Sequence, residues 1–190
     1  MKLVFATNNA NKLSELQALV PKGIEILSLK DINCNEELPE TNPTLEKNAL
    51  QKAKYVYQNY GFNCFADDTG LEIEALGGLP GVYSARYAGE DCVAEDNMRK
   101  VLNNLENEKN RNAKFRTVIA LIINGEENLF HGECNGVITK NKSGVEGFGY
   151  DPIFSPDGCE ITFAEMSKIN KGAISHRGRA VKELIGFFNC

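Results

Sequence analysis

The sequence predicts an α/β fold built on a mixed β-sheet, and three observations support this prediction. Short apolar runs alternate with segments whose apolar residues recur at helical spacing. Two strand-like runs, residues 115–123 and 128–139, are joined by Asn124-Gly125, which is a strong hairpin signal. Helix-linked strands favour parallel pairing and a hairpin imposes antiparallel pairing, so we expect both kinds in one sheet. The length of 190 residues suits a single domain over residues 1–190, with two lobes and no separate linker.

The first elements read as strand, helix, strand and loop. Residues 3–6 form an apolar run typical of a buried strand, and leucines then recur at helical spacing from Leu13 up to Pro21. Residues 24–27 read as a second strand, and residues 30–42 as a loop rich in acidic residues. This order places a polar loop at the carboxyl end of the first strand.

The next helix has clear start and stop signals. Asn42 is the expected N-cap, Pro43 suits the first turn, and Gly61 suits the end. The apolar stripe between them consists of Leu45, Ala49, Ala53, Val56, Tyr57 and Tyr60.

Two adjacent carboxylates follow the short apolar run 62–66. We expect this run to be a buried strand that ends in Asp67-Asp68 and breaks at Gly70, which delivers both charges to the rim of the sheet. Adjacent carboxylates repel unless a cation or hydrogen-bond donors offset their charge. Mg2+ is the usual partner of such a pair, bound by one or two carboxylates and substrate phosphates. The alternative is a solvated turn capped by an aspartate.

The second half begins with a strand-like run, 71–76, and a glycine-rich loop, 77–81. Helical spacing predicts a third helix over residues 94–105. Residues 140–172 are rich in Gly, Pro and Lys and predict loops with short elements. A last helix over 176–188 buries Ala180, Val181, Leu184, Ile185 and Phe188.

Charge and composition exclude several classes of protein. The net charge of -5 argues against binding to a nucleic-acid backbone or to an anionic membrane. The six cysteines form no CxxC motif, no apolar run reaches the length of a membrane span, and the N-terminal apolar run is too short for a signal peptide. We therefore expect a cytoplasmic protein with no membrane or nucleic-acid partner.

The first candidate site lies where the first strand meets the first helix. It consists of Thr7, Asn8, Asn9, Ala10, Asn11 and Lys12. Free amides at a helix N-terminus attract anions, and Lys12 adds a full positive charge, so the segment is a candidate phosphate-binding loop. The alternative is an Asn-capped turn with a surface lysine. It is not a Walker A loop, because the Gly-x-x-x-x-Gly-Lys pattern is absent.

A third acidic residue stands before the second helix. Glu40 could join Asp67 and Asp68 around one metal ion, although Glu36 and Glu37 compete for that role on sequence alone. The alternative is a solvated acidic loop, the commoner meaning of a charge run.

Two further segments suit a flat polar ligand. In the segment 147–152, glycines flank two aromatic residues, so that the backbone can approach a ligand while a ring stacks on it. Lys171, His176 and Arg177 supply hydrogen-bond donors near the last helix N-terminus, where cations oppose the helix dipole unless an anion or a polar ligand is present. The alternatives are a turn with a buried aromatic residue and an exposed basic turn.

Taken together, these segments resemble the inosine triphosphate pyrophosphatase family, also called the Ham1 or RdgB-like family, nearly end to end. The matching segments are Thr7-Asn8-Asn9-x-x-Lys12, the Glu40 region with Asn48-Ala49 and Lys52, Ala66-Asp67-Asp68-Thr69-Gly70, Leu76-Gly77-Gly78-x-Pro80-Gly81, Tyr83-Ser84-Ala85-Arg86-Tyr87, Gly147-Phe148-Gly149-Tyr150-Asp151-Pro152 and Ser175-His176-Arg177. Their order is the family's order, and the set is highly specific. One departure is Asn8, where many members have Gly.

The resemblance implies an elongated mixed sheet, two lobes and a central nucleotide cleft. It also implies a Mg2+-dependent homodimer that hydrolyses ITP, dITP and XTP to the monophosphate and pyrophosphate, which keeps deaminated purines out of DNA and RNA. Glu40 and Asp68 would serve the metal, with Asp67 as a further candidate ligand, and Asp68 would be the acidic residue that carries catalysis. The substrate-binding residues would be Thr7, Asn8, Asn9, Ala10, Asn11, Lys12, Lys52, Thr69, Phe148, Gly149, Tyr150, Asp151, Lys171, His176 and Arg177.

Two rival classes stay open at this point. One is a Maf-type pyrophosphatase of related fold that acts on other modified nucleotides, against which the Ser-His-Arg and Phe-Gly-Tyr-Asp segments argue. The other is a non-catalytic nucleotide-binding module, against which the retained acids Glu40, Asp67 and Asp68 argue.

Overall fold

The computed structural model describes residues 1–20 and 23–189 and confirms the α/β class. The strands are β1 (Lys2–Phe5), β2 (Glu25–Leu27), β3 (Cys64–Ile73), β4 (Pro80–Gly81), β5 (Asn112–Ile123), β6 (Glu126–Ile138) and β7 (Phe154–Pro156). The α-helices are α1 (Ala10–Gln17), α2 (Leu45–Tyr60), α3 (Ala94–Asn104), α4 (Lys168–Ile174) and α5 (His176–Phe188). No helix in these two stretches is long and apolar enough to cross a membrane.

The strands form one mixed sheet, as the sequence predicts. Its order is β2-β1-β3-β5-β6-β7, and β4 pairs with β3 outside that path. β1 runs parallel to both β2 and β3, whereas β4 pairs antiparallel with β3 and β7 antiparallel with β6. The parallel pairing of β1 and β3 brings the carboxyl end of β1, where the candidate phosphate loop begins, beside Phe65 of β3.

The chain divides into two compact units, which are described separately below. Unit 1 comprises Met1–Asp68, Thr117–Gly132 and Arg177–Cys190, and unit 2 comprises Thr69–Arg116 and Glu133–His176.

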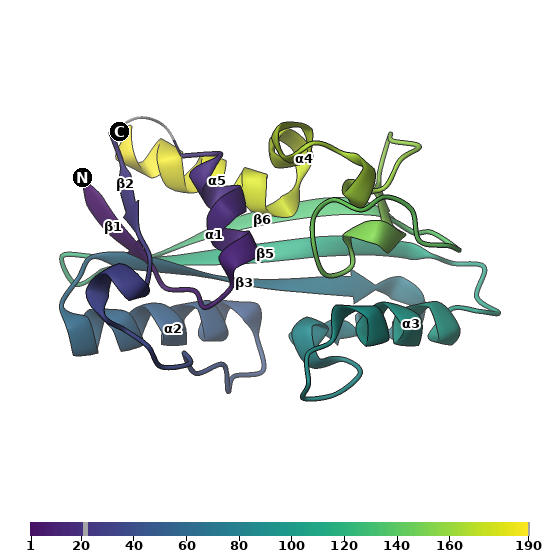
Figure 1. Ribbon diagram of the computed structural model, residues 1–190, viewed down its shortest axis with the longest axis horizontal. Coiled ribbons are helices and arrows are strands. Elements are labelled where there is room, and N and C mark those ends of the chain that lie inside the picture. The colour runs from purple at the N-terminus through teal and green to yellow at the C-terminus, as the bar shows by residue number, and fades with distance from the viewer. Residues whose placement is uncertain (21–22, 190) are drawn as a thin grey trace. The chain divides into compact units, whose positions relative to one another are not determined.

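In unit 1, α1 and α5 cover one side of the strands and α2 covers the other (Figure 1). The core between the strands and the helices α1 and α5 contains Leu3, Phe5, Leu16, Phe65, Ile119, Leu121, Ala180, Val181 and Leu184. The rings of Phe5 and Phe65 stack with centroids 4.7 Å apart, which fixes β1 against β3. The apolar helix faces predicted from the sequence therefore pack on the two sides of the strands in this unit.

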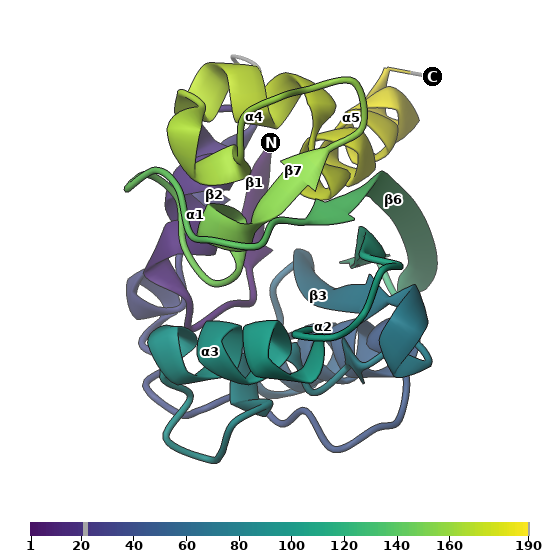
Figure 2. The same cartoon turned by 90° about the vertical axis from the view of Figure 1, so that its right-hand side faces the viewer.

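In unit 2, α3 and α4 lie on opposite sides of the strands (Figures 1 and 2). Its core contains Leu71, Ile73, Met98, Val101, Leu105, Ala113, Phe115, Cys134, Ile138, Tyr150, Ile153, Phe154, Phe163 and Met166. The segment 140–172, predicted as loops with short elements, contains β7 and most of α4. Aromatic rings dominate this part of the core, with Phe115 and Phe154 edge-to-face at 4.7 Å.

The helix ends agree with the sequence in part. Gly61 ends α2 in the left-handed conformation (φ 73°), as predicted. The N-cap of α2 is Thr44, whose side chain accepts a hydrogen bond from the Lys47 amide, so the predicted cap at Asn42 is wrong. α1 ends at Gln17, earlier than its leucine spacing suggested, and Pro21 lies outside the described residues.

The largest difference from the sequence prediction is β3. The strand does not end at Asp67-Asp68; it continues for ten residues, through Gly70 to Ile73. Gly70 is required for another reason than a turn, because a Cβ there would lie 2.7 Å from the Gly81 carbonyl oxygen of the paired strand β4. The two aspartates are therefore buried inside a strand and do not lie at its rim. The Asn124-Gly125 turn is confirmed, with φ of 51° and 87°.

Candidate active site

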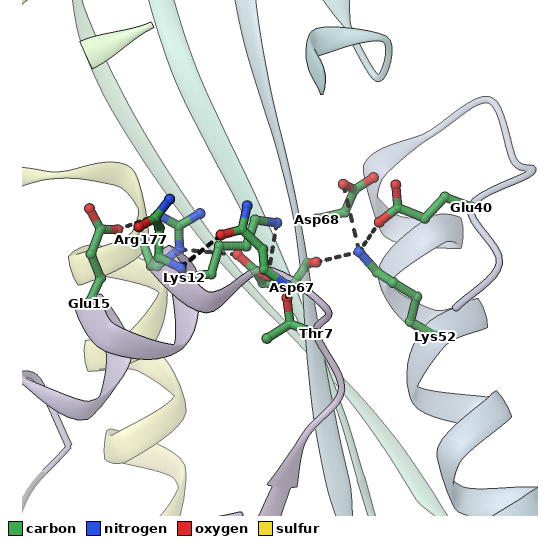
Figure 3. Close-up of polar contacts among 10 residues, drawn as sticks. Thr7, Lys12, Glu15, Glu40, Lys52, Asp67, Asp68 and Arg177 are labelled. Carbon is green, nitrogen blue, oxygen red and sulfur yellow. Dashed lines mark hydrogen bonds and ion pairs between the residues drawn. The ribbon is translucent and has the colours of Figure 1, made fainter. Parts of the chain in front are cut away.

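The two adjacent aspartates of β3 serve different partners in unit 1. Successive side chains of a strand point to opposite faces of the sheet. Asp67 contacts Lys12 and Arg177, whereas Asp68 lies next to Lys52 (Figure 3). The repulsion between neighbouring carboxylates is thus offset by separate cations.

Asp67 is the centre of a buried ion-pair chain. Its Oδ1 accepts a hydrogen bond from Lys12 Nζ at 3.0 Å and its Oδ2 accepts one from Arg177 Nε at 3.1 Å. Arg177 Nη1 also donates to Glu15 Oε2 of α1 at 2.5 Å. Burial alone would raise the pKa of Asp67, but Lys12, Arg177 and Lys52 together hold that pKa well below its usual range. Asp67 is therefore an ionised anchor for two cations.

The candidate phosphate loop is ordered by its own side chains. Asn9 caps α1, and its Oδ1 accepts from the amides of Asn11 (2.9 Å) and Lys12 (3.2 Å). Asn8 Nδ2 donates to the Glu36 carbonyl at 3.1 Å. Burial lowers the pKa of Lys12, and Asp67 opposes this effect. These contacts fix Lys12 at the amino end of α1, where an anion is favoured by the helix dipole.

Lys52 of α2 connects the two carboxylates predicted as metal ligands. Its Nζ contacts Glu40 Oε1 and lies 4.0 Å from Asp68 Oδ1. It also donates to the Asp67 carbonyl oxygen at 2.7 Å. The structure thus selects Glu40, among the three acids of its loop, as the one beside Asp68.

The charge states within this group differ. Burial raises the pKa of Asp68 above its usual range, and Lys52 and Lys12 offset this only in part. Burial also acts to raise the pKa of Glu40, but Lys52 outweighs it and the net shift is downward. For Lys52, burial is outweighed by Asp68 and Glu40, so its pKa is raised. Asp68 is therefore the more basic of the two carboxylates, a property that suits a proton acceptor.

The donor set of this group fits a hard divalent cation. Within residues 1–20 and 23–189, no three His, Cys, Asp or Glu side chains form a cluster able to hold a metal by themselves. Mg2+ is commonly held by one or two carboxylates together with substrate phosphates. Glu40 and Asp68, which approach the same ammonium group, supply such a pair.

Unit 2 contains the second candidate group. Asp151 Oδ2 accepts hydrogen bonds from the Phe148 amide (2.7 Å) and from Lys171 Nζ (2.6 Å). Lys171 Nζ also lies 5.1 Å from the ring centroid of Phe148 and 5.5 Å from that of Phe163. The carboxylate therefore orders the segment 148–151 and holds an ammonium group next to a half-buried ring.

The other predicted residues of unit 2 differ in their burial. His176 is 3% exposed and stacks on Phe115 with centroids 4.5 Å apart. Tyr150 is buried, its hydroxyl donates to the Ser84 carbonyl at 2.8 Å, and burial raises its pKa. Gly149 has a positive φ and Thr69 is half-buried in β3. Direct contact of these four residues with a substrate stays a prediction.

Gly147 is expected to tolerate no side chain. Its φ is +74°, and a Cβ would overlap Asp151 Oδ2. We expect Gly147→Ala to displace Asp151 and to lower the melting temperature by more than Gly158→Ala does. Gly158 is a matched control, because its φ is +77° but no atom lies within 4 Å of its Cβ position. Thermal unfolding of both variants checks this, and equal losses would contradict it.

Two buried contacts of the site were missed by sequence reasoning. Glu15 binds Arg177, a residue 162 positions away, and no local pattern announces this pairing. Asn48 is 1% exposed on α2, and its Oδ1 accepts a hydrogen bond from the Asn42 amide at 2.8 Å. A signal for Asn48 was present, since it lies one turn before Lys52 among the apolar residues of the helix.

The fold and the two groups define an α/β protein with a buried carboxylate–lysine site, and the comparisons give the family. The Ham1 family model matches residues 3–187. A dITP/XTP pyrophosphatase of Flavobacterium psychrophilum is 57% identical over 99% of both chains, and one of Porphyromonas gingivalis is 50% identical over 100% of this chain and 98% of its own.

Solved structures agree with this match. The Ham1 protein of Staphylococcus aureus has a TM-score of 0.89 at 38% identity, and that of Coxiella burnetii has 0.91 at 36%; each comparison covers 100% of this chain and 98% of the other. The chain belongs to the Ham1 family, as its motifs predicted.

Proposed function

We propose that this chain is a nucleoside triphosphate pyrophosphatase that hydrolyses ITP, dITP and XTP to the monophosphate and pyrophosphate. The observation that carries the proposal is the convergence of Glu40 and Asp68 on Lys52 Nζ, beside the Lys12–Asp67 pair. Family membership and the printed names of the relatives support the substrate class. We also propose that the protein acts as a cytoplasmic homodimer on the free nucleotide pool.

The residues of unit 1 suit attack of water on the α-phosphorus. Asp68 accepts the proton of the attacking water as the new P–O bond forms, and the raised pKa of this carboxylate favours that role. The bond from the α-phosphorus to the bridging oxygen breaks, and pyrophosphate leaves. Lys12 and Lys52 are placed to offset the charge on the phosphates.

Mg2+ is part of this proposal, with Glu40 and Asp68 as its protein ligands. When bound, it would supply charge neutralisation at phosphate oxygens. Asp67 is committed to Lys12 and Arg177, and this pairing favours a supporting role for it.

The residues of unit 2 suit an oxo-purine. Phe148 offers a ring for stacking, and Lys171 offers a donor that hypoxanthine or xanthine can meet with the 6-oxo group. Adenine presents a 6-amino donor there, so a donor would face the buried ammonium group where an acceptor is needed. His176 and Arg177 stay candidates for the same discrimination.

A panel of nucleoside triphosphates tests the proposal against its rivals. Wild-type protein is incubated with Mg2+ and ITP, dITP, XTP, ATP, GTP or modified pyrimidine triphosphates, and pyrophosphate and orthophosphate are measured separately. We expect pyrophosphate from ITP, dITP and XTP and little from ATP or GTP. Turnover confined to pyrimidine nucleotides would favour the Maf-type alternative, and binding without turnover would favour the non-catalytic module.

A further inference from the structure

One motif of the sequence has no part in the proposed reaction so far. The stretch Tyr83-Ser84-Ala85-Arg86-Tyr87 is among the segments that resemble the family, yet none of its residues is assigned to the metal or to the substrate. Within it, Ser84 is buried in unit 2. A buried hydroxyl group is costly unless it finds hydrogen-bond partners. The partners of Ser84 therefore show what this segment holds.

Ser84 fixes its segment to the strand β3. Its Oγ accepts a hydrogen bond from the Leu71 amide of β3 at 2.9 Å and donates one to the Gly81 carbonyl oxygen at 2.6 Å. One short side chain thus joins β3, the strand β4 and the segment that follows β4.

The helix α3 holds the same segment through a second side chain. Asn97 is buried on α3. Its Oδ1 accepts a hydrogen bond from the Ala88 amide at 2.6 Å, and its Nδ2 donates one to the Ala85 carbonyl oxygen at 2.8 Å. Both ends of the carboxamide are bonded to backbone. The backbone around Ser84 is therefore fixed to β3 and to α3, which makes it a rigid anchor.

Tyr150 binds this anchor. Its ring lies in the core of unit 2, and its Oη donates a hydrogen bond to the Ser84 carbonyl oxygen at 2.8 Å. A phenol has one proton to donate, and Tyr150 is only 5% exposed. This geometry favours a supporting role for the hydroxyl over the substrate contact that the sequence led us to expect.

The residues beside Tyr150 belong to the candidate group for an oxo-purine. The Phe148 amide and Lys171 Nζ donate to Asp151 Oδ2, and the Asp151 amide donates to the Phe148 carbonyl oxygen at 3.2 Å. The bonds between Phe148 and Asp151 fix the shape of the loop 148–151. Its place on the unit depends on contacts to other segments, namely Lys171 of α4 and the bond from Tyr150 to Ser84, 66 positions away.

We propose that Tyr150 is a positioning residue, which places the Phe148 ring and the Asp151–Lys171 pair for the base by fixing their loop to the Ser84 carbonyl. The inference rests on the proposed function, because that function brings an oxo-purine to this loop. A displaced loop would stack on the base less well. The groups assigned to the attack on phosphorus belong to unit 1, so loss of the anchor should weaken nucleotide binding more than it slows the chemical step.

Removing one hydroxyl group tests the proposal. Tyr150→Phe keeps the ring in the core and deletes the donor to Ser84. Tyr87→Phe is the matched control, because its hydroxyl accepts a hydrogen bond from Asn104 Nδ2 at 3.0 Å on the same segment. With ITP and Mg2+, we expect Tyr150→Phe to raise KM about three- to tenfold, the usual contribution of one hydrogen bond, with kcat within about twofold of wild type.

The control variant should keep both constants within about twofold of wild type. A fall in kcat at unchanged KM in Tyr150→Phe, or equal changes of KM in the two variants, would overturn the proposal.

A second variant separates positioning from direct contact with the substrate. Ser84→Ala keeps the carbonyl that accepts from Tyr150 but deletes the hydroxyl that fixes this carbonyl to β3. We expect Ser84→Ala to raise KM as well, and Tyr150→Phe to add less in that background than in wild type, since residues of one network couple. An unchanged KM in Ser84→Ala, or fully additive effects, would assign the Tyr150 hydroxyl to the substrate and overturn the positioning role.

Amide hydrogen exchange supplies a readout that does not need turnover. In protein without nucleotide, we expect the segment 147–152 to exchange about three- to tenfold faster in Tyr150→Phe than in wild type or Tyr87→Phe. Equal exchange in the three proteins would overturn the anchor. A wild type that releases no pyrophosphate from ITP would reject the proposed function, while exchange would still report on the anchor. A wild type active on ITP with an unaffected Tyr150→Phe variant would reject the positioning role alone.

Discussion

Replacing Asp68 with Asn is expected to lower kcat for ITP by about 10²–10⁴-fold, the usual contribution of general acid–base catalysis. The amide cannot accept the proton of the attacking water, and it is a poor ligand for a hard cation compared with a carboxylate. The size of the side chain is unchanged, so packing in β3 is preserved. The assay is steady-state pyrophosphate release at saturating Mg2+.

The same variant is expected to melt at the wild-type temperature or above it in metal-free buffer at neutral pH. Burial raises the pKa of Asp68, which means that the ionised carboxylate is disfavoured in the folded state. Removing that charge removes an unfavourable contribution to the stability of the folded state, as often happens at active sites. Asp91→Asn is the matched control, because Asp91 is exposed, and it should leave both kcat and melting temperature unchanged. Near-normal turnover in Asp68→Asn would contradict the assignment of Asp68 as the catalytic residue.

Replacing Asp67 with Asn is expected to have the largest effect on stability. The substitution leaves the buried cations Lys12 and Arg177 without their shared carboxylate. Breaking a buried ion pair by removing one partner costs about 3–5 kcal/mol, which corresponds to a loss of roughly 6–20 °C in melting temperature for a chain of this size. Thermal unfolding followed by circular dichroism measures this directly.

Glu127→Gln is the matched control for that experiment. Glu127 pairs with Lys54 at 2.9 Å, but both side chains are more than 40% exposed, and exposed pairs contribute about 0–1 kcal/mol. Its melting temperature should stay close to that of wild type. A loss of similar size in the two variants would show that the buried Asp67 cluster stabilises the fold no more than an exposed ion pair does.

The contribution of Asp67 also has a defined pH dependence. Its folded pKa lies below the ordinary value of 3.8, so the ionised form is favoured by folding. The stabilisation is therefore complete above about pH 4 and is lost as the pH falls below that value through the folded pKa. The difference in melting temperature between wild type and Asp67→Asn should shrink in that acid range and stay constant at neutral pH.

Several elements could be predicted from local sequence because their signals lie within a few residues. Gly61 ends α2 and Asn124-Gly125 turns between β5 and β6, since both need positive φ angles that glycine and asparagine adopt readily. The amphipathic stripe of α5 was also recognisable. The end of β3 was predicted wrongly because Asp, Thr and Gly are common turn residues, and only the close approach of Gly81 in β4 explains Gly70 inside a strand.

The site shows the same division. The sequence by itself determined the α/β class, the family and the set of acids and lysines, because motif order and periodicity are properties of the chain alone. Only the tertiary structure decided that Asp67 binds Lys12 and Arg177 while Asp68 lies beside Lys52. Arg177 and Asp67 are 110 residues apart. Such pairings depend on which face of a strand each side chain takes and on which helix packs there, and no local pattern carries that information.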